Sequence, residues 1–322
     1  MALLESYISQ LDKIFKNQSR HASHKIAAPL VLEMCKNKAI LYEIIRNNLV
    51  DDKLFTNQQH GPVIGFDIVI QRDYTFSAHA FFPVPNRADN ISHNWIHHHD
   101  HSLLTTGNAF GEKGYKSMLF NMDYHLDPTT KKVTNLKVTK EFSHPLHNIE
   151  FIDAFEPHVV YLPSALTITY ALWSFDYLPK LDLLRSNPLI KLFKSPLKKI
   201  INIFKIEKAL AVETETDDRQ FATENGEFVC VGNLQYIPTS NATYLQNLFY
   251  LLQQVKFDDA IFLSELKKRA AAKGRNDVVE LIDKLMNGIP INDEMDYNQF
   301  NSKGMNFTYE SVLEASKKIS TI

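Results

Sequence analysis

Apolar residues at helical spacing dominate the first part of the chain. Between residues 1 and 57 apolar side chains recur three or four positions apart, and the first glycine is Gly61. This spacing is typical of amphipathic helices, and the strong helix formers around it favour the same structure. We predict a helical N-terminal extension over residues 1–60. The pattern returns at residues 241–286 and predicts a mainly helical C-terminal region over residues 181–322.

The pattern changes between residues 61 and 180. Short runs rich in Val, Ile, Thr, Tyr and Phe alternate with clusters of Gly, Pro, Asn and Asp. Many short strands at this spacing are typical of a sandwich or barrel. The predicted strands lie at residues 66–76, 115–120, 131–139, 159–162 and 166–173. The sequence therefore predicts an α+β fold, with an antiparallel β-barrel or jelly roll between two helical additions.

Composition narrows the class of protein. The 322 residues are 44% hydrophobic and 22% charged, which is typical of a globular chain, and the net charge of −2 gives no reason to expect a nucleic-acid partner. No apolar run is long enough for a membrane span, and the first residues lack the apolar core of a secretory signal. The two cysteines, Cys35 and Cys230, form no disulfide framework. We therefore predict a cytoplasmic location.

A basic stretch follows the predicted barrel. Between Lys180 and Lys208 the chain carries eight Lys or Arg and two Asp or Glu, a net charge of +6. Such a segment suits an anionic partner or a membrane surface, or it is a solvated helical face. Pro188 and Pro196 interrupt any long amphipathic helix, which favours the solvated face. The partners that we expect are a small-molecule substrate and a second copy of the chain, bound through the helical additions.

Four of the thirteen histidines occupy five consecutive positions: His97, His98, His99 and His101. On a β-strand, successive side chains point to opposite faces, so three of them share one face and His98 points away with Asp100. Imidazoles two residues apart on a strand are ready ligands for one metal ion. The spacing leaves two pairs open, His97 with His99 and His99 with His101.

His158 is the best candidate for a third ligand. Pro157 stands before it, and a β run, a Pro163-Ser164 turn and a second β run follow. A strand–turn–strand unit of this kind can bring His158 alongside the first histidine strand. We predict His99, His101 and His158 as metal ligands, with His97 as a substitute or as a hydrogen-bonding neighbour of a ligand.

These motifs resemble the cupin superfamily of small metal-binding β-barrels over residues 61–178. The resemblance rests on the His-x-His strand with the glycines at 107, 111 and 114 after it, and on Pro157-His158 with the two β runs that follow. In that family the first motif gives two histidine ligands and often a glutamate, and the second gives another histidine. Residues 103–106 contain no glutamate, so the chain resembles the three-histidine cupins, of which cysteine dioxygenase is the known type.

The resemblance implies a metal-dependent enzyme, most of all a non-haem Fe(II) oxygenase acting on a small molecule. Zn, Mn, Ni and Cu are alternative metals. A cupin-like binding or regulatory protein without catalysis, and a non-oxidative Zn or Mn enzyme, are the alternative functions. His144 and His147 are weaker candidates for contacts around the metal or substrate, and His125 is expected to be exposed. Arg72 is a candidate partner for a substrate carboxylate, with a surface ion pair as the commoner role.

Overall fold

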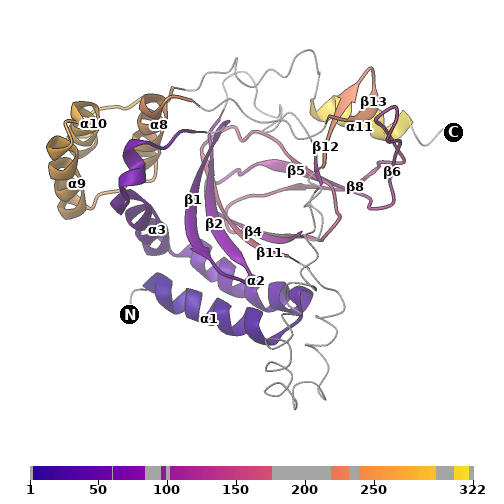
Figure 1. The fold of residues 1–322 in the computed structure, drawn as a ribbon, viewed down its shortest axis with the longest axis horizontal. Coiled ribbons are helices and arrows are strands. Elements are labelled where there is room, and N and C mark those ends of the chain that lie inside the picture. The colour runs from indigo at the N-terminus through magenta and orange to yellow at the C-terminus, as the bar shows by residue number, and fades with distance from the viewer. Residues whose placement is uncertain are drawn as a thin grey trace, which may run out of the picture.

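The computed structural model describes residues 3–59, 61–83, 96–98, 102–175, 219–231, 239–294 and 308–318. In these parts of the chain, two antiparallel sheets lie between helices from the N-terminal and C-terminal regions (Figure 1). The α+β class with helical additions on both sides of a β-rich region is confirmed. Each described helix is too short or too polar to cross a membrane.

Three helices form the N-terminal region, as the apolar spacing predicts. They are α1 (Leu3–Asn17), α2 (Arg20–Lys36) and α3 (Lys38–Val50), followed by the short 3₁₀ helix η1 (Asp52–Phe55). The Ser19 side chain accepts a hydrogen bond from the Ala22 amide at the start of α2, and Asn37 caps α3 in the same way. Such caps satisfy amide groups that have no partner inside the helix, so they fix where each helix begins.

The first sheet has five strands in the order β1-β2-β11-β4-β9. Their bounds are β1 (Val63–Ile70), β2 (Thr75–Phe81), β4 (Ser102–Phe110), β9 (Ile149–Ile152) and β11 (Thr167–Phe175). The predicted run at residues 66–76 is thus a hairpin with its turn at 71–74, because Arg72 and Asp73 interrupt the apolar alternation.

The second sheet has eight strands in the order β6-β7-β13-β12-β3-β10-β5-β8. Their bounds are β3 (Ile96–His98), β5 (Lys116–Phe120), β6 (His125–Leu126), β7 (Lys132–Thr134), β8 (Val138–Ser143), β10 (His158–Val160), β12 (Arg219–Glu224) and β13 (Glu227–Cys230). β12 and β13 belong to the region expected to be mainly helical, so that region also contributes to the β structure. The predicted run 131–139 is divided at Asn135, whose φ of 60° suits a turn.

In the described part of the chain, four helices follow the strands. They are α8 (Asn241–Gln254), α9 (Ala260–Ala272), α10 (Asn276–Met286) and α11 (Tyr309–Lys318). α8, α9 and α10 lie beside α3, and α11 lies at the other end of the molecule beside β12 and β13 (Figure 1). The basic segment at residues 180–208 lies outside the described residues.

Among the described residues, two large hydrophobic cores hold these layers together. The larger core joins α1–α3 and α8–α10 to one face of the five-stranded sheet, where Phe76, Tyr170 and Leu248 are fully buried. The smaller core lies between the eight-stranded sheet and α11, around Val159, Tyr161 and Val312. Tyr161 is fully buried in this core, so it packs on the face opposite His158.

Candidate functional site

The two faces of the five-stranded sheet have different surroundings. On the face that we call outer, a Cβ built on Gly107 would lie 2.7 Å from Cys35 Sγ and 3.1 Å from Val31 Cγ1, both in α2. The helices therefore pack directly against this face. Because side chains alternate along a strand, the neighbouring Thr106 and Asn108 point to the opposite, inner face.

The inner faces of the two sheets are turned toward each other. Leu104 and Ala171 of the five-stranded sheet form a small buried cluster with Leu119 of the eight-stranded sheet. His158 is paired directly with Leu119. Directly opposed residues of an antiparallel pair share one face, so the His158 side chain points into the space between the sheets.

His97 and His158 meet in this inter-sheet space. They are the paired residues of β3 and β10. Their ring centroids lie 5.9 Å apart, with 28° between the ring planes. His158 is buried and His97 is half-buried. The prediction that the His158 segment lies alongside the histidine strand is therefore confirmed, and His97 is the histidine that faces it.

The other predicted ligands fall outside what the structure describes. His99, Asp100 and His101 are not among the described residues, and for His98 only the backbone in β3 is described. Within the described residues, no group of three or more His, Cys, Asp or Glu side chains is arranged to hold a metal ion. The metal site of His99, His101 and His158, with His97 as its alternative, therefore stays a prediction.

A hydrogen-bonded chain of inner-face side chains was missing from the sequence-based prediction. His144 Nε2 lies 2.7 Å from Thr106 Oγ1, which lies 3.3 Å from Tyr115 Oη. Asn148 Nδ2 lies 3.4 Å from His144 Nδ1, and it also donates to Glu150 Oε1 at 3.1 Å and to Ser143 O at 3.3 Å. The Thr106 hydroxyl can donate or accept, so either neutral tautomer of His144 can pair with it.

His79 lies on the same inner face, with the Phe81 ring between it and Tyr115. It is paired with Thr169 across β2 and β11, and its Nε2 lies 3.2 Å from Ser77 Oγ. Burial lowers the pKa of His79 to about 4 and that of His144 to about 4, while burial raises the pKa of Tyr115 to about 12. These three side chains are therefore uncharged at neutral pH.

The alternation in β2 is the sequence signal for His79. Phe76, Ala78 and Ala80 belong to the buried core beneath the helices, whereas Ser77 and His79 point the other way. Reading the alternation onward from Phe76 would have placed a histidine on the inner face. His144, one of the weaker candidates, is fully buried, and this was not evident from its flanking prolines and polar residues.

The remaining candidates lie away from the inter-sheet space or at the surface. His147 and His125 are exposed, which confirms the expectation for His125. Arg72 is exposed in the β1–β2 turn. On the outer face, His24 of α2 is buried with Nδ1 2.7 Å from Thr105 Oγ1 and Nε2 2.7 Å from Ser174 Oγ.

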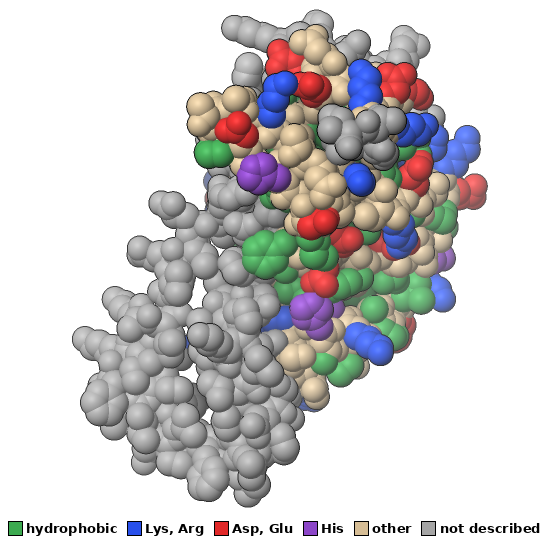
Figure 2. All heavy atoms as spheres, turned by 90° about the vertical axis from the view of Figure 1, so that its right-hand side faces the viewer, with side chains coloured by type: hydrophobic (Ala, Val, Ile, Leu, Met, Phe, Trp, Pro, Cys, Tyr) green, Lys and Arg blue, Asp and Glu red, His purple; other side chains and the backbone are tan. Residues whose placement is uncertain are grey.

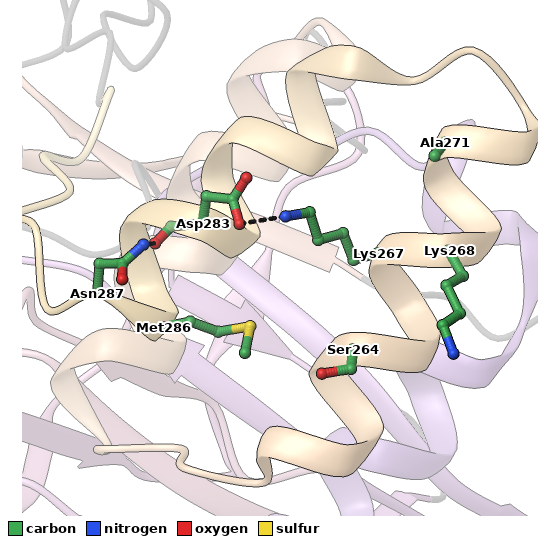
Figure 3. Close-up of a pocket in the computed structure, with 7 residues that line it drawn as sticks. All are labelled: Ser264, Lys267, Lys268, Ala271, Asp283, Met286 and Asn287. Carbon is green, nitrogen blue, oxygen red and sulfur yellow. Dashed lines mark hydrogen bonds and ion pairs between the residues drawn. The ribbon is translucent and has the colours of Figure 1, made fainter.

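The surface offers less specific features. A shallow pocket lies between α9 and α10, where Lys267 Nζ and Asp283 Oδ1 are 2.5 Å apart (Figure 3). This pair neutralises itself, and the pocket lies on helices far from the histidines. Figure 2 shows the side that carries α11: on its described part, acidic and basic side chains are interspersed rather than gathered by sign.

Comparisons with known proteins add a loose structural likeness. No protein-family model matches the chain, and no curated protein matches it. Among solved structures, the cupin domain of Cnp3 from Schizosaccharomyces pombe matches 37% of this chain and 69% of its own, at 7% identity and a TM-score of 0.26. A cupin superfamily protein from Desulfitobacterium hafniense matches 37% of this chain and 84% of its own, at 7% identity and a TM-score of 0.23.

Another match is hydroxypropylphosphonic acid epoxidase from S. wedmorenis. It covers 37% of this chain and 56% of that protein, at 11% identity and a TM-score of 0.24. Two of these three solved structures are named as cupin proteins, and each likeness extends over little more than a third of this chain.

Proposed function

We propose that the chain is a cupin-type, metal-dependent enzyme that binds a small molecule between its two sheets, and that it is a non-haem Fe(II) oxygenase. One observation carries the proposal: His97 and His158, far apart in the sequence, lie opposite each other on the inner face of the eight-stranded sheet. A cluster of histidines that arose by chance at the surface gives no reason for one of them to lie opposite a buried histidine from a distant strand.

The described residues fit a metal site in part. Two imidazoles on adjacent strands suit Fe, Zn, Cu or Ni. A third ligand is needed for a stable centre, and the sequence offers His99 and His101 directly after β3. Bound ferrous iron would supply redox chemistry that no side chain provides. The chain itself would hold the metal through His158 and His97, and the facing sheets would exclude bulk water from the substrate.

The alternative is a cupin-like binding or regulatory protein without catalysis, and one observation favours it. No complete set of ligands is assembled among the described residues. In that case the stacked rings of His97 and His158 are packing groups in a ligand pocket. A Zn or Mn enzyme with non-oxidative chemistry would use the same imidazoles.

Metal content tests the proposal. Protein produced without a histidine tag is analysed by elemental mass spectrometry, as purified and after loading with Fe(II), Zn(II) or Mn(II). We expect near-stoichiometric metal in the wild type and at least a tenfold loss in His97→Ala/His158→Ala, because a site left with one ligand fewer than it needs binds weakly. His99→Ala/His101→Ala should lose metal to the same extent.

His125→Ala is the matched control, because it removes an exposed histidine from β6 and should retain all the metal. Wild-type protein that is purified without metal and takes up none of the three ions would reject the enzyme proposal in favour of the binding protein. If metal is present, oxygen consumption with small thiols and amino acids as substrates separates an Fe(II) oxygenase from a non-oxidative enzyme.

A further inference from the structure

Helix α9 presents a continuous stripe of side chains to solvent. Ile261, Glu265, Lys268 and Ala272 follow one another at steps of four, three and four residues, so they share one face of the helix. All four are exposed. The opposite face of α9 is buried in the larger core, and the helix lies at the margin of the molecule beside α3 and α10 (Figure 1). The stripe is therefore the outward surface of α9.

One end of this stripe is apolar. Ile261 is 78% exposed, the largest exposed fraction among the large hydrophobic side chains of the described residues. α9 and α10 run antiparallel, since Lys267 in the middle of α9 is paired with Asp283 toward the end of α10. Exposed Met286 and Ile289, at the end of α10, therefore lie at the same end of the helix pair as Ile261. Exposed apolar side chains gathered in this way are typical of a contact site.

The other end of the stripe is small and lies beside a hollow. Ala271 and Ala272, in the last turn of α9, are exposed and carry nothing beyond Cβ. The shallow pocket between α9 and α10 has a volume of about 500 Å³, and Lys268 and Ala271 line it on the side of α9 (Figure 3). A large apolar side chain from outside has room to pack here, as a knob between the residues of a facing helix. The face thus offers a projecting side chain at one end and space for one at the other.

The centre of the stripe carries one charge of each sign. Within the part of the chain that the structure describes, neither Glu265 nor Lys268 takes part in an ion pair. The other cations of α9, by contrast, are paired with carboxylates of the same chain. Glu265 and Lys268 therefore remain available for opposite charges on a partner.

An antiparallel copy of α9 matches the charges and the side-chain sizes in a single register. A two-fold axis midway between residues 266 and 267 places Glu265 level with the partner's Lys268. The same axis places Ile261 level with the partner's Ala272, beside the hollow of the second copy. Each contact forms twice, because the two copies are equivalent. A parallel copy would instead bring like charges together.

We propose that the outward face of α9 is a self-association surface, and that its partner is a second copy of this chain packed antiparallel to it. The inference makes specific the expectation of a second copy bound through the helical additions. It is independent of the proposed function, because no histidine of the inter-sheet space takes part. A single helix of 13 residues gives a small interface, below about 1,200 Å² in total, so we expect a weak dimer that forms as the concentration rises.

Sedimentation velocity of the full chain measures the association. The wild type is studied from about 2 to about 300 μM, a range that brackets micromolar dissociation constants. We expect the sedimentation coefficient to rise from that of a monomer to that of a dimer. A wild-type protein that stays monomeric over the whole range would overturn the proposal.

Charge reversals locate the surface. Glu265→Lys and Lys268→Glu each bring like charges together at both central contacts, so each should weaken the dimer by at least about tenfold. Lys25→Glu, at an exposed position of α2, is the matched control, because it changes the net charge as Lys268→Glu does. It should leave the association unchanged. A dimer that survives both reversals on α9 forms through another surface and would reject the assignment.

Mixing the two single variants tests the register. In a heterodimer of Glu265→Lys with Lys268→Glu, both central contacts again join opposite charges. The equimolar mixture should therefore associate with nearly wild-type affinity, although neither variant does so alone. A mixture that stays monomeric would reject the antiparallel arrangement.

The apolar contact has a test of its own. Ile261→Ser should weaken the dimer by at least about threefold, because it removes the side chain that packs over the partner's alanines. Unchanged affinity would overturn the packing. All substituted side chains are exposed, so the far-ultraviolet circular dichroism of each variant should match that of the wild type. Metal content depends on other residues, so failure of either proposal leaves the other standing.

Discussion

Buried histidines that stay neutral are the most consequential single residues of this molecule. His24 is held between α2 and the outer face of the five-stranded sheet by Thr105 and Ser174. Its pKa is lowered to about 3, first by burial and then by the charges of His21 and Arg20. The unfolded chain binds a proton near the ordinary pKa of 6.5, so acid favours unfolding.

Because the folded pKa is the lower one, the neutral histidine stabilises the fold fully above pH 6.5, and this stability is lost progressively from pH 6.5 toward pH 3. Between pH 7 and pH 5, protonation of His24 in the unfolded chain should lower the free energy of unfolding by about 2 kcal/mol. We expect His24→Gln, which cannot be protonated, to be less stable than the wild type at pH 7 but to lose about 2 kcal/mol less on going to pH 5. Urea titrations at the two pH values measure both effects.

Exposed His125 supplies the comparison for this prediction. His125→Gln makes the same substitution at an exposed histidine outside the His24 contacts and is the matched control. His79 and His144, with pKa values lowered to about 4, add to the wild-type slope in both variants. If His24→Gln and the wild type lose equal stability between pH 7 and pH 5, His24 is protonated in the folded protein and the interpretation is wrong.

Strand glycines show how elements of this fold approach one another. At Gly107 in β4 an added Cβ would lie 2.6 Å from Ile149 Cδ1 and 2.7 Å from Cys35 Sγ, so β4 and α2 are in contact through the missing side chain. At Gly65 in β1 the nearest atom would be 3.9 Å away, an ordinary contact. Gly107→Ala should destabilise the protein by about 1–3 kcal/mol through overpacking.

Gly65→Ala is the control, because it adds the same methyl group to an extended strand and should change the stability by less than about 0.5 kcal/mol. Chemical denaturation of the two variants measures the difference. Equal destabilisation by the two substitutions would mean that loss of the glycine itself, and not the contact with α2, determines the effect.

Helices and strands could be predicted from the sequence where the regular spacing of apolar residues continued without interruption. The helices at residues 3–50 and 241–286 and the strands near 116–120 and 167–175 follow directly from apolar spacing. Their partners do not, because pairing depends on contacts distant in the sequence. The strand–turn–strand unit after Pro157 is an example: β10 and β11 lie in different sheets. His158 was still assigned correctly to the neighbourhood of the histidine strand, since β10 pairs with β3.

Only part of the candidate site, the histidine strand, could be predicted from the sequence. The density of histidines indicated residues 97–101 as a candidate site. Strand alternation then predicted which of these histidines share one face of the strand. His79 is one histidine in an apolar run, and Thr106 and Tyr115 are ordinary strand residues, so composition gives no hint of them. Their relation arises from register: Thr169 is paired with both His79 and Asn108, and Ala171 is paired with Thr106. Such register cannot be predicted from local pattern when both faces of a strand are buried.

At the scale of the whole molecule, the helical additions and the five-stranded sheet share one core. Leu248 of α8 is fully buried in the same cluster as Phe76 of β2. We therefore expect helices and sheet to unfold together. In a Trp95→Phe background, urea titrations followed by far-ultraviolet circular dichroism and by Trp173 fluorescence should give one common midpoint, as two-state unfolding requires.

Leu248→Ala should lower both midpoints equally, with a loss of about 2–5 kcal/mol for the cavity that it leaves. Ile261→Ala, on the neighbouring α9 with 78% of its side chain exposed, should move neither. Two separated transitions, with only the helical signal responding to Leu248→Ala, would show that the helices α8–α10 form an independent unit.

The passage of the chain from β10 to β11 bears on how fast this protein folds. The two strands are consecutive in the sequence but do not pair with each other. β10 pairs with β3 and β5, whereas β11 pairs with β2 and β4. Each must wait for partners that lie tens of residues away, and the loops must close before any interstrand bond compensates for the lost entropy. His97 and His158 would therefore meet only late in folding, when β10 joins β3 within the eight-stranded sheet.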